Sequence, residues 1–270
     1  MDLSQQNLIF AFTLTLVAGL STGLGSMLAF FTKATNKKQL AGALGLSAGV
    51  MIYVAMIEMF ATARSELSAV SGASQGYLLT TVCFFAGIAV IALIDFLVPD
   101  LTNPHEIKDE ADLANASPAD LSLLRMSLLT SLAVAIHNFP EGIATFTSAL
   151  EDPTLGISIA IAIAIHNIPE GIAISIPVYC ATGNRRKAFL ISLFSGLAEP
   201  LGAVLAYLLL RQYHSEMMLG IVTAAVAGIM VFISLDELLP PAEKYGEHHV
   251  AMGGLIAGMV LMAVGLVLFA

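Results

Sequence analysis

The sequence predicts an all-α membrane protein with eight transmembrane helices, for three reasons. Of its 270 residues, 57 % are hydrophobic and only 11 % are charged, whereas a soluble domain carries about 25 % charged residues. The apolar residues form long runs, and a run of about 20 residues can cross a bilayer as a helix. The few Lys and Arg residues gather in alternate loops, as is typical of a polytopic membrane protein.

Eight apolar runs are long enough to cross the membrane, and together they form one transmembrane domain over residues 1–270. Residues 1–7 contain no basic residue, so the first run is expected to be a retained span and not a cleaved signal. The connections are short except for an acidic, polar loop at residues 100–123. The predicted spans lie at about 8–31, 39–62, 76–99, 124–149, 155–180, 187–210, 217–240 and 249–269.

The distribution of basic residues predicts the orientation of the spans. One alternate set of loops and helix ends holds nine basic residues: Lys33, Lys37, Lys38, Lys108, Arg125, Arg185, Arg186, Lys187 and Lys244. The other set holds only Arg64 and Arg211. Because basic residues favour the cytoplasmic side, both termini are expected to face outward.

Charge and cysteine content exclude some classes of function. A net charge of −9 argues against a nucleic-acid partner, which needs a basic surface. Cys83 and Cys180 both lie in apolar runs without a zinc-binding spacing. Two buried thiols are expected, although the sequence leaves a disulfide between them open.

One decapeptide occurs twice in the middle of the chain. Residues 135–144 read Ala-Ile-His-Asn-Phe-Pro-Glu-Gly-Ile-Ala, and residues 164–173 repeat them with Ile168 in place of Phe139. On a helix, residues three and four apart share a face, so Glu141 lies on the side of His137 and Asn138. The second copy places His166, Asn167 and Glu170 in the same way.

These side chains form a ligand set for a divalent metal ion. Imidazole nitrogen, carboxylate oxygen and amide oxygen all bind such ions, and the two copies fall near the middle of adjacent antiparallel spans. Glu199 in the sixth span adds a third central carboxylate. Carboxylates inside a membrane repel one another unless protons or a cation neutralise them, so a bound divalent cation is the favoured interpretation. Pro140, Pro169 and Pro200 are each expected to kink a helix and free a carbonyl at this site.

At these motifs the sequence resembles the ZIP (Zrt- and Irt-like) metal transporters, most closely the bacterial ZupT-type branch. The resemblance rests on the two His-Asn-x-Pro-Glu-Gly segments, on Ala-Glu-Pro at 198–200 and on Ser-Leu-Asp-Glu-Leu-Leu-Pro at 234–240. It implies eight helices in a 3+2+3 plan with an inverted pseudo-repeat, a homodimer in the bacterial inner membrane, and uptake of zinc into the cytoplasm. Metal ions and the lipid bilayer are then the partners, and no catalytic cofactor is implied.

The resemblance also implies a binuclear metal site. His137, Glu141, His166 and Glu170 are expected at one metal position. Asn138, Asn167 and Glu199 are expected at the second, with Glu141 and Glu170 bridging the two. Mixed nitrogen and oxygen ligands suit Zn²⁺ and also Fe²⁺, Mn²⁺, Co²⁺ and Cd²⁺, so the order of preference stays open.

Four further residues are candidates for the transport pathway. Met51 could offer a thioether or simply pack. Glu58, Asp236 and Glu237 lie near helix ends, where carboxylates are often interfacial.

The resemblance also suggests alternating access of an elevator type, in which the fourth and fifth helices move together. The rival interpretation is an intramembrane metal-dependent hydrolase, which the missing His-Glu-x-x-His spacing disfavours. A purely structural scaffold would bind no metal. The protein is therefore expected to be a transporter and not an enzyme.

Overall fold

The computed structural model describes residues 4–30, 37–97, 121–212, 215–244 and 248–269. In these residues every element of regular structure is a helix. Most of the acidic loop expected at 100–123 lies outside the described residues. The elements are α1 (Gln5–Ala29), α2 (Lys37–Tyr53), η1 (Val54–Met59), α3 (Phe60–Ser71), α4 (Ala73–Leu97), α6 (Leu121–Glu151), α7 (Pro153–Thr182), α8 (Arg185–Gly196), α9 (Ala198–Gln212), α10 (Glu216–Ile233), η2 (Ser234–Leu238), α11 (Leu239–Lys244) and α12 (His248–Phe269).

Seven helical stretches of the described chain are long and apolar enough to cross a membrane, judged by length and composition. The protein is therefore an all-helical polytopic membrane protein. The seven are Gln5–Ala29, Ala41–Ser71, Ala73–Phe96, Pro153–Thr182, Arg185–Gln212, Met217–Asp236 and His248–Leu268. The fourth span predicted from the sequence corresponds to α6, which is 31 residues long but is not one of the seven.

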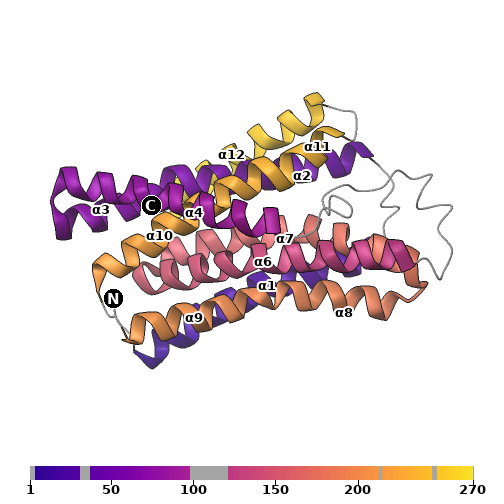
Figure 1. Ribbon diagram of the computed structural model, residues 1–270, viewed down its shortest axis with the longest axis horizontal. Helices are drawn as coiled ribbons and strands as arrows, with labels where there is room; N and C mark the ends of the chain where they lie inside the picture. The colour runs from indigo at the N-terminus through magenta and orange to yellow at the C-terminus, as the bar shows by residue number, and fades with distance from the viewer. Residues whose placement is uncertain (1–3, 31–36, 98–120, 213–214, 245–247, 270) are drawn as a thin grey trace.

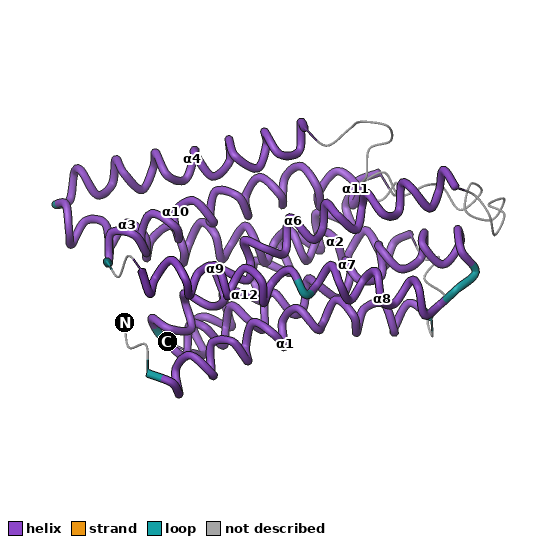
Figure 2. The backbone as a smooth tube through the Cα atoms, turned by 60° about the horizontal axis from the view of Figure 1, so that its bottom comes forward, coloured by secondary structure: helices purple, strands orange, loops and turns teal. Residues whose placement is uncertain are grey.

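The helices pack as two bundles that lie side by side along the long axis of the molecule (Figure 1). In this article, the metal-site bundle is α1, α6, α7 and α8–α9, and the flanking bundle is α2–α3, α4, α10–α11 and α12. The bundles meet where α2 packs on α7 and α10 packs on α6. The start of α1 and the end of α12 lie at the same end of the molecule in both views (Figure 1, Figure 2).

The second predicted span ends later than its apolar run indicated. The run was expected to end near residue 62, but the helix continues through Ser71. A helix needs apolar side chains only inside the bilayer, so Arg64 and Glu66 do not interrupt it. It ends at Gly72, whose φ of 87° is unfavourable for residues with a side chain. Within this stretch, residues Val54–Met59 form a π-helical turn.

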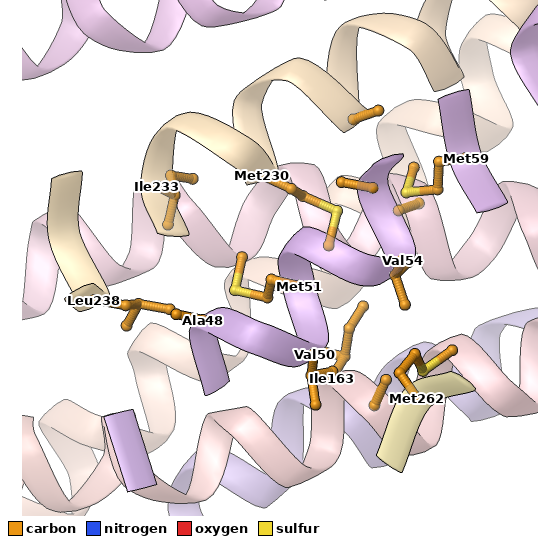
Figure 3. Packing of buried hydrophobic residues seen from close by; sticks show 14 of the residues in the cluster. Ala48, Val50, Met51, Val54, Met59, Ile163, Met230, Ile233, Leu238 and Met262 are labelled. Atoms are coloured by element: carbon orange, nitrogen blue, oxygen red, sulfur yellow. The ribbon is translucent and has the colours of Figure 1, made fainter. Parts of the chain in front are cut away.

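The core between the bundles is apolar. Figure 3 shows Met51 of α2 among buried side chains that include Met230 of α10 and Ile163 of α7. Two cavities also lie between the bundles. The larger one, of about 430 Å³, is lined by Val90, Ile91, Ile94, Ala135, Ile136, Phe139, Pro140, Ile143, Val226 and Ile229. The smaller one, of about 90 Å³, is lined by Val50, Ser158, Ile161, Ala162, Ile165, Leu261, Met262 and Gly265.

Candidate metal site

The two copies of the decapeptide lie at matching depth because α6 and α7 are joined by a single residue. Asp152 caps α7: its Oδ1 accepts hydrogen bonds from the backbone N–H groups of Thr154 at 2.7 Å and Leu155 at 3.2 Å. Pro153 follows at the first helical position, where its missing N–H is not needed. His137 and His166 stand 15 and 14 residues from Asp152, a difference of about 1.5 Å along a helix.

A buried imidazole, that of His166, contacts the glutamates of both repeats. Nε2 of His166 is 3.0 Å from Oε1 of Glu141 and 3.1 Å from its Oε2. The same nitrogen is 4.0 Å from Oε1 of Glu170. His166 and Glu141 are fully buried, and Glu170 is 4 % exposed. Ionisable groups so deep inside a membrane bundle are costly, and this placement supplies nitrogen and oxygen donors in one spot.

The two asparagines anchor the site to the neighbouring helices. Nδ2 of Asn138 donates to the backbone carbonyl of Ser195 at 3.3 Å. Nδ2 of Asn167 donates to the carbonyl of Ala18 at 2.9 Å and also to Oε1 of Glu199. Both amide oxygens are buried and accept no hydrogen bond from the described residues. A buried oxygen without a donor is unfavourable, and such an oxygen suits a cation.

Glu199 reaches the site from a break in the sixth predicted span. The helix is interrupted at Leu197, between α8 and α9, as expected where Pro200 cannot donate to the carbonyl of Gly196. The carboxylate of Glu199 lies in the first turn of α9, where the helix dipole favours negative charge. By contrast, α6 and α7 remain helical through Pro140 and Pro169.

The structure brings five of the seven predicted ligands into two contacting groups. Glu141, His166 and Glu170 form one group, and Asn167 with Glu199 forms the other; adjacent residues of α7 join them. Asn138 is buried beside α8. The side chain of His137 lies outside the described ones. Among the side chains that are described, no group of three or more His, Cys, Asp or Glu residues is arranged to hold a metal ion.

The structure describes the side chains of three of the four predicted pathway residues. Met51 is 1 % exposed and belongs to the apolar core. Glu58 is half-buried in the π-helical turn η1, and Asp236 is exposed in the turn η2. The side chain of Glu237 lies outside the described ones.

Glycines in and around the decapeptides let the helix backbones touch. A Cβ added at Gly142 would overlap the carbonyl oxygen of Glu199, and one at Gly171 would overlap that of Thr22. The same holds for Gly25 against Ile168 and for Gly202 against Phe139. Small residues allow this approach between membrane helices. The site is therefore built on main-chain contacts among four helices.

Sequence reasoning missed the part that α1 plays. Thr22 and Ser26 of α1 are fully buried, and their hydroxyl oxygens have no hydrogen-bond partner among the described residues. The carbonyl of Ala18 holds the amide of Asn167. The only signal in the sequence was the run of small residues Gly19, Gly23 and Gly25, which indicates close packing but not with what.

Comparison with known proteins agrees with the motifs. Residues 99–266 match the family model described as ZIP Zinc transporter. Three bacterial proteins named Zinc transporter ZupT are similar over nearly their whole length. The protein from Clostridium perfringens is 57 % identical over 98 % of each chain, and that from Chlorobaculum parvum is 58 % identical over 97 % of this chain and 98 % of its own. The protein from Akkermansia muciniphila is 50 % identical over 99 % of this chain and all of its own.

The expected bacterial branch is thus confirmed, together with a multi-pass location in a bacterial membrane. The duplicated motif, the buried metal-ligand side chains between the helices and the similarity across nearly the full length all indicate the same family. The chain belongs to the ZIP zinc transporter family.

Proposed function

We propose that the protein takes up zinc into the cytoplasm through the site between α6 and α7. The observation that carries this proposal is the buried contact of His166 with Glu141 and Glu170, beside the contact of Asn167 with Glu199. Nitrogen and oxygen donors without thiolate suit Zn²⁺ and allow Fe²⁺, Mn²⁺, Co²⁺ and Cd²⁺. The relatives named as zinc transporters support zinc as the substrate.

The ligands divide between two metal positions. His137, Glu141, His166 and Glu170 would hold one ion, and Asn138, Asn167 and Glu199 would hold the second. Glu141 and Glu170 would bridge the two ions. The amide oxygens of Asn138 and Asn167 support the second position because they are buried and accept no hydrogen bond from the described residues.

We infer eight spans with both termini outside. They are the seven candidate helices and α6, which is the fourth span in chain order. An even number of spans agrees with the start of α1 and the end of α12 lying at one end of the molecule. At 31 residues, α6 exceeds the length of about 20 that a span needs. It also packs along α7, which is one of the seven candidates.

An inverted repeat is supported by contacts that recur at constant spacing in the metal-site bundle. The contact of Gly171 with Thr22 has its counterpart in that of Gly142 with Glu199. The contact of Asn167 with Ala18 has its counterpart in that of Asn138 with Ser195. The partners differ by 177 positions between α1 and α8–α9, and by 29 between α6 and α7. Gly25 with Ile168 and Gly202 with Phe139 follow the same spacing.

The flanking bundle follows the same plan. Gly49 of α2 lies against the carbonyl of Leu255, and Gly228 of α10 lies against that of Phe84. These positions differ by 179 between α2 and α10, and by 171 between α4 and α12. The π-helical turns η1 and η2 fall at corresponding places. Three helices on each side of α6 and α7 thus correspond, as a 3+2+3 arrangement requires.

Transport would proceed by alternating access with the whole metal-site bundle as the moving unit. The resemblance suggested that α6 and α7 move together. However, the backbone of α7 lies directly against that of α1, and the backbone of α6 lies directly against that of α9. These four would therefore move as one body against the flanking bundle. The seam around Met51, Met230 and Ile163 consists of apolar side chains, which can slide past one another without breaking hydrogen bonds of their own.

The two cavities between the bundles differ in volume. Alternating access needs such a difference between the two structural repeats. Ile91, Ile136 and Ile229 line the cavity of about 430 Å³. Their counterparts by the same spacings, Met262, Ile165 and Val50, line the cavity of about 90 Å³. Related seams are therefore open to different extents.

The decisive experiment is zinc uptake into proteoliposomes that contain the purified full chain. We expect zinc uptake above that of empty vesicles, loss of uptake in Glu141→Ala, and normal uptake in Glu243→Ala. Glu243 is an exposed glutamate of α11 whose carboxylate contacts His248. A native rate in Glu141→Ala would remove the site from the pathway.

The hydrolase alternative has no support, since the relatives are named as transporters. A homodimer is proposed from the family resemblance, and the mass of the purified protein in a nanodisc measures it.

A further inference from the structure

Thr22 lies in the C-terminal half of α1, and its hydroxyl does not bond to the carbonyl four residues earlier. Six threonines of the described helices donate to the carbonyl four residues earlier: Thr13, Thr15, Thr80, Thr81, Thr147 and Thr182. Thr22 is fully buried, and its Oγ1 has no hydrogen-bond partner among the described residues. A buried hydroxyl in this state is unfavourable.

The reason is that two other side chains, one of them a predicted metal ligand, already donate to that acceptor. The carbonyl four residues before Thr22 belongs to Ala18. It accepts from the hydroxyl of Ser21 at 2.6 Å and from the amide of Asn167 at 2.9 Å. A carbonyl oxygen has two lone pairs, and in a helix one of them accepts the backbone N–H four residues on. The side chains of Ser21 and Asn167 share the other, so this carbonyl is not left for the hydroxyl of Thr22.

Thr22 also occupies the position in α1 that corresponds to Glu199 in α9, by the spacing of 177 residues between the two repeats. Its carbonyl lies against Gly171, as that of Glu199 lies against Gly142. Asn167 donates to Glu199, and the corresponding neighbour of Asn138 would be Thr22. The hydroxyl of Thr22 lies beside the break between α8 and α9, since a Cβ at Gly196 would be 2.8 Å from its Oγ1.

We propose that Thr22 is a selectivity residue of the metal site, the neutral counterpart of Glu199. This inference rests on the proposed function. The hydroxyl supplies an oxygen on the Asn138 side of the second metal position, to the ion or to a water molecule that the ion carries. Glu199 supplies a negative oxygen on the Asn167 side. The second position is thus charged on one side and neutral on the other.

This arrangement affects which ions bind. A hydroxyl is a hard oxygen donor, and hard donors favour Mn²⁺ and Zn²⁺ over the softer Cd²⁺. Its loss is expected to weaken zinc binding and to raise the ability of cadmium to compete. The size expected for one neutral hydrogen bond or ligand is about threefold to tenfold in affinity.

The test compares four variants of the full chain, purified and reconstituted. Thr22→Val keeps the shape of the side chain and removes the hydroxyl, and Thr22→Ala removes the hydroxyl together with a methyl group. Thr22→Ser keeps the hydroxyl. The matched control is Thr15→Val on the same helix, because Thr15 is also fully buried but its hydroxyl bonds the carbonyl of Ala11 at 2.9 Å. The readouts are the zinc-induced rise in melting temperature and the competition of cadmium with zinc in uptake.

Thr22→Val and Thr22→Ala are expected to need about threefold to tenfold more zinc for half of the thermal shift, with cadmium competing better. Thr22→Ser and Thr15→Val should keep the zinc dependence of the original protein. The proposal is overturned if either variant without the hydroxyl, folded by its melting curve, binds zinc and selects ions as the original does. It is also overturned if Thr15→Val changes selectivity equally. Zinc uptake by the unaltered protein tests the proposed function separately, and failure there with zinc binding intact leaves the thermal comparison decisive for Thr22.

Discussion

Nε2 of His166 lies 3.0 Å from Oε1 of Glu141, so the histidine of one repeat meets the carboxylate of the other. Neither decapeptide makes this contact alone. It joins α6 to α7 at the point where both helices carry their buried polar groups. Among the described side chains of the site, only that of His166 can offer a nitrogen ligand to a metal ion.

Replacing His166 with Asn should shift preference among ions. The imidazole suits zinc, whereas sites made of oxygen donors suit manganese. We expect the ratio of zinc to manganese uptake to fall by about tenfold, which corresponds to about 1.4 kcal/mol of binding. His248→Asn is the control, because His248 is exposed at the start of α12 and contacts Glu243. An unchanged ratio in proteoliposomes would show that His166 does not touch the ion.

Gly142→Ala and Gly171→Ala should each destabilise the protein. The added methyl group would overlap a main-chain carbonyl that cannot rotate away, and overpacking costs about 1–3 kcal/mol. We expect a lower melting temperature and weaker zinc uptake. Gly253→Ala provides the comparison, since a Cβ there would meet no atom within 4 Å. It should be neutral or slightly stabilising because alanine is the better helix former.

Asp152→Ala should lower stability without changing the choice of ion. The variant loses the cap that accepts from Thr154 and Leu155, which is worth about 0.5–2 kcal/mol. Asp152→Ser and Asp152→Asn should restore most of the loss, since both side chains can cap a helix. Thermal melting of the purified proteins checks the order. A cap-restoring variant as unstable as Asp152→Ala would assign the effect to something other than capping.

Zinc binding should release protons. The carboxylates of Glu141 and Glu170 and the imidazole of His166 bind a metal only in their deprotonated forms. As pH falls, protons compete with zinc, so the zinc concentration for half-maximal uptake should rise while the maximal rate changes less. Calorimetry in two buffers with different ionisation enthalpies counts the protons. Equal heats in both buffers, with uptake insensitive to pH, would contradict this ligand set.

The sequence predicted the helical membrane fold and the meeting of the two decapeptides, because both follow from residue types and their spacing. The contact between Asn167 and Glu199 agrees with the family resemblance, which implied that both belong to one metal position. The anchoring of Asn138 and Asn167 on the carbonyls of Ser195 and Ala18 could not be predicted, since every residue type carries a carbonyl. His137 and its role as a ligand stay a prediction.

The π-helical turns η1 and η2 were also missed. One extra residue in a helical turn leaves the apolar pattern of a membrane helix almost unchanged, because nearly every residue there is apolar. The continuation of the second span to Ser71 was missed for a related reason. Hydropathy reports where the bilayer ends, and the helix ends only at Gly72.

The glycine contacts have a consequence for the sizes of ions that the site can accept. The four helices around it touch through carbonyl oxygens and Cα atoms, which cannot yield by rotating about a bond. The frame of the site therefore cannot contract around a small ion or expand around a large one while the bundle stays intact. Adjustment to ionic radius is left to the side-chain torsions of the glutamates, asparagines and His166.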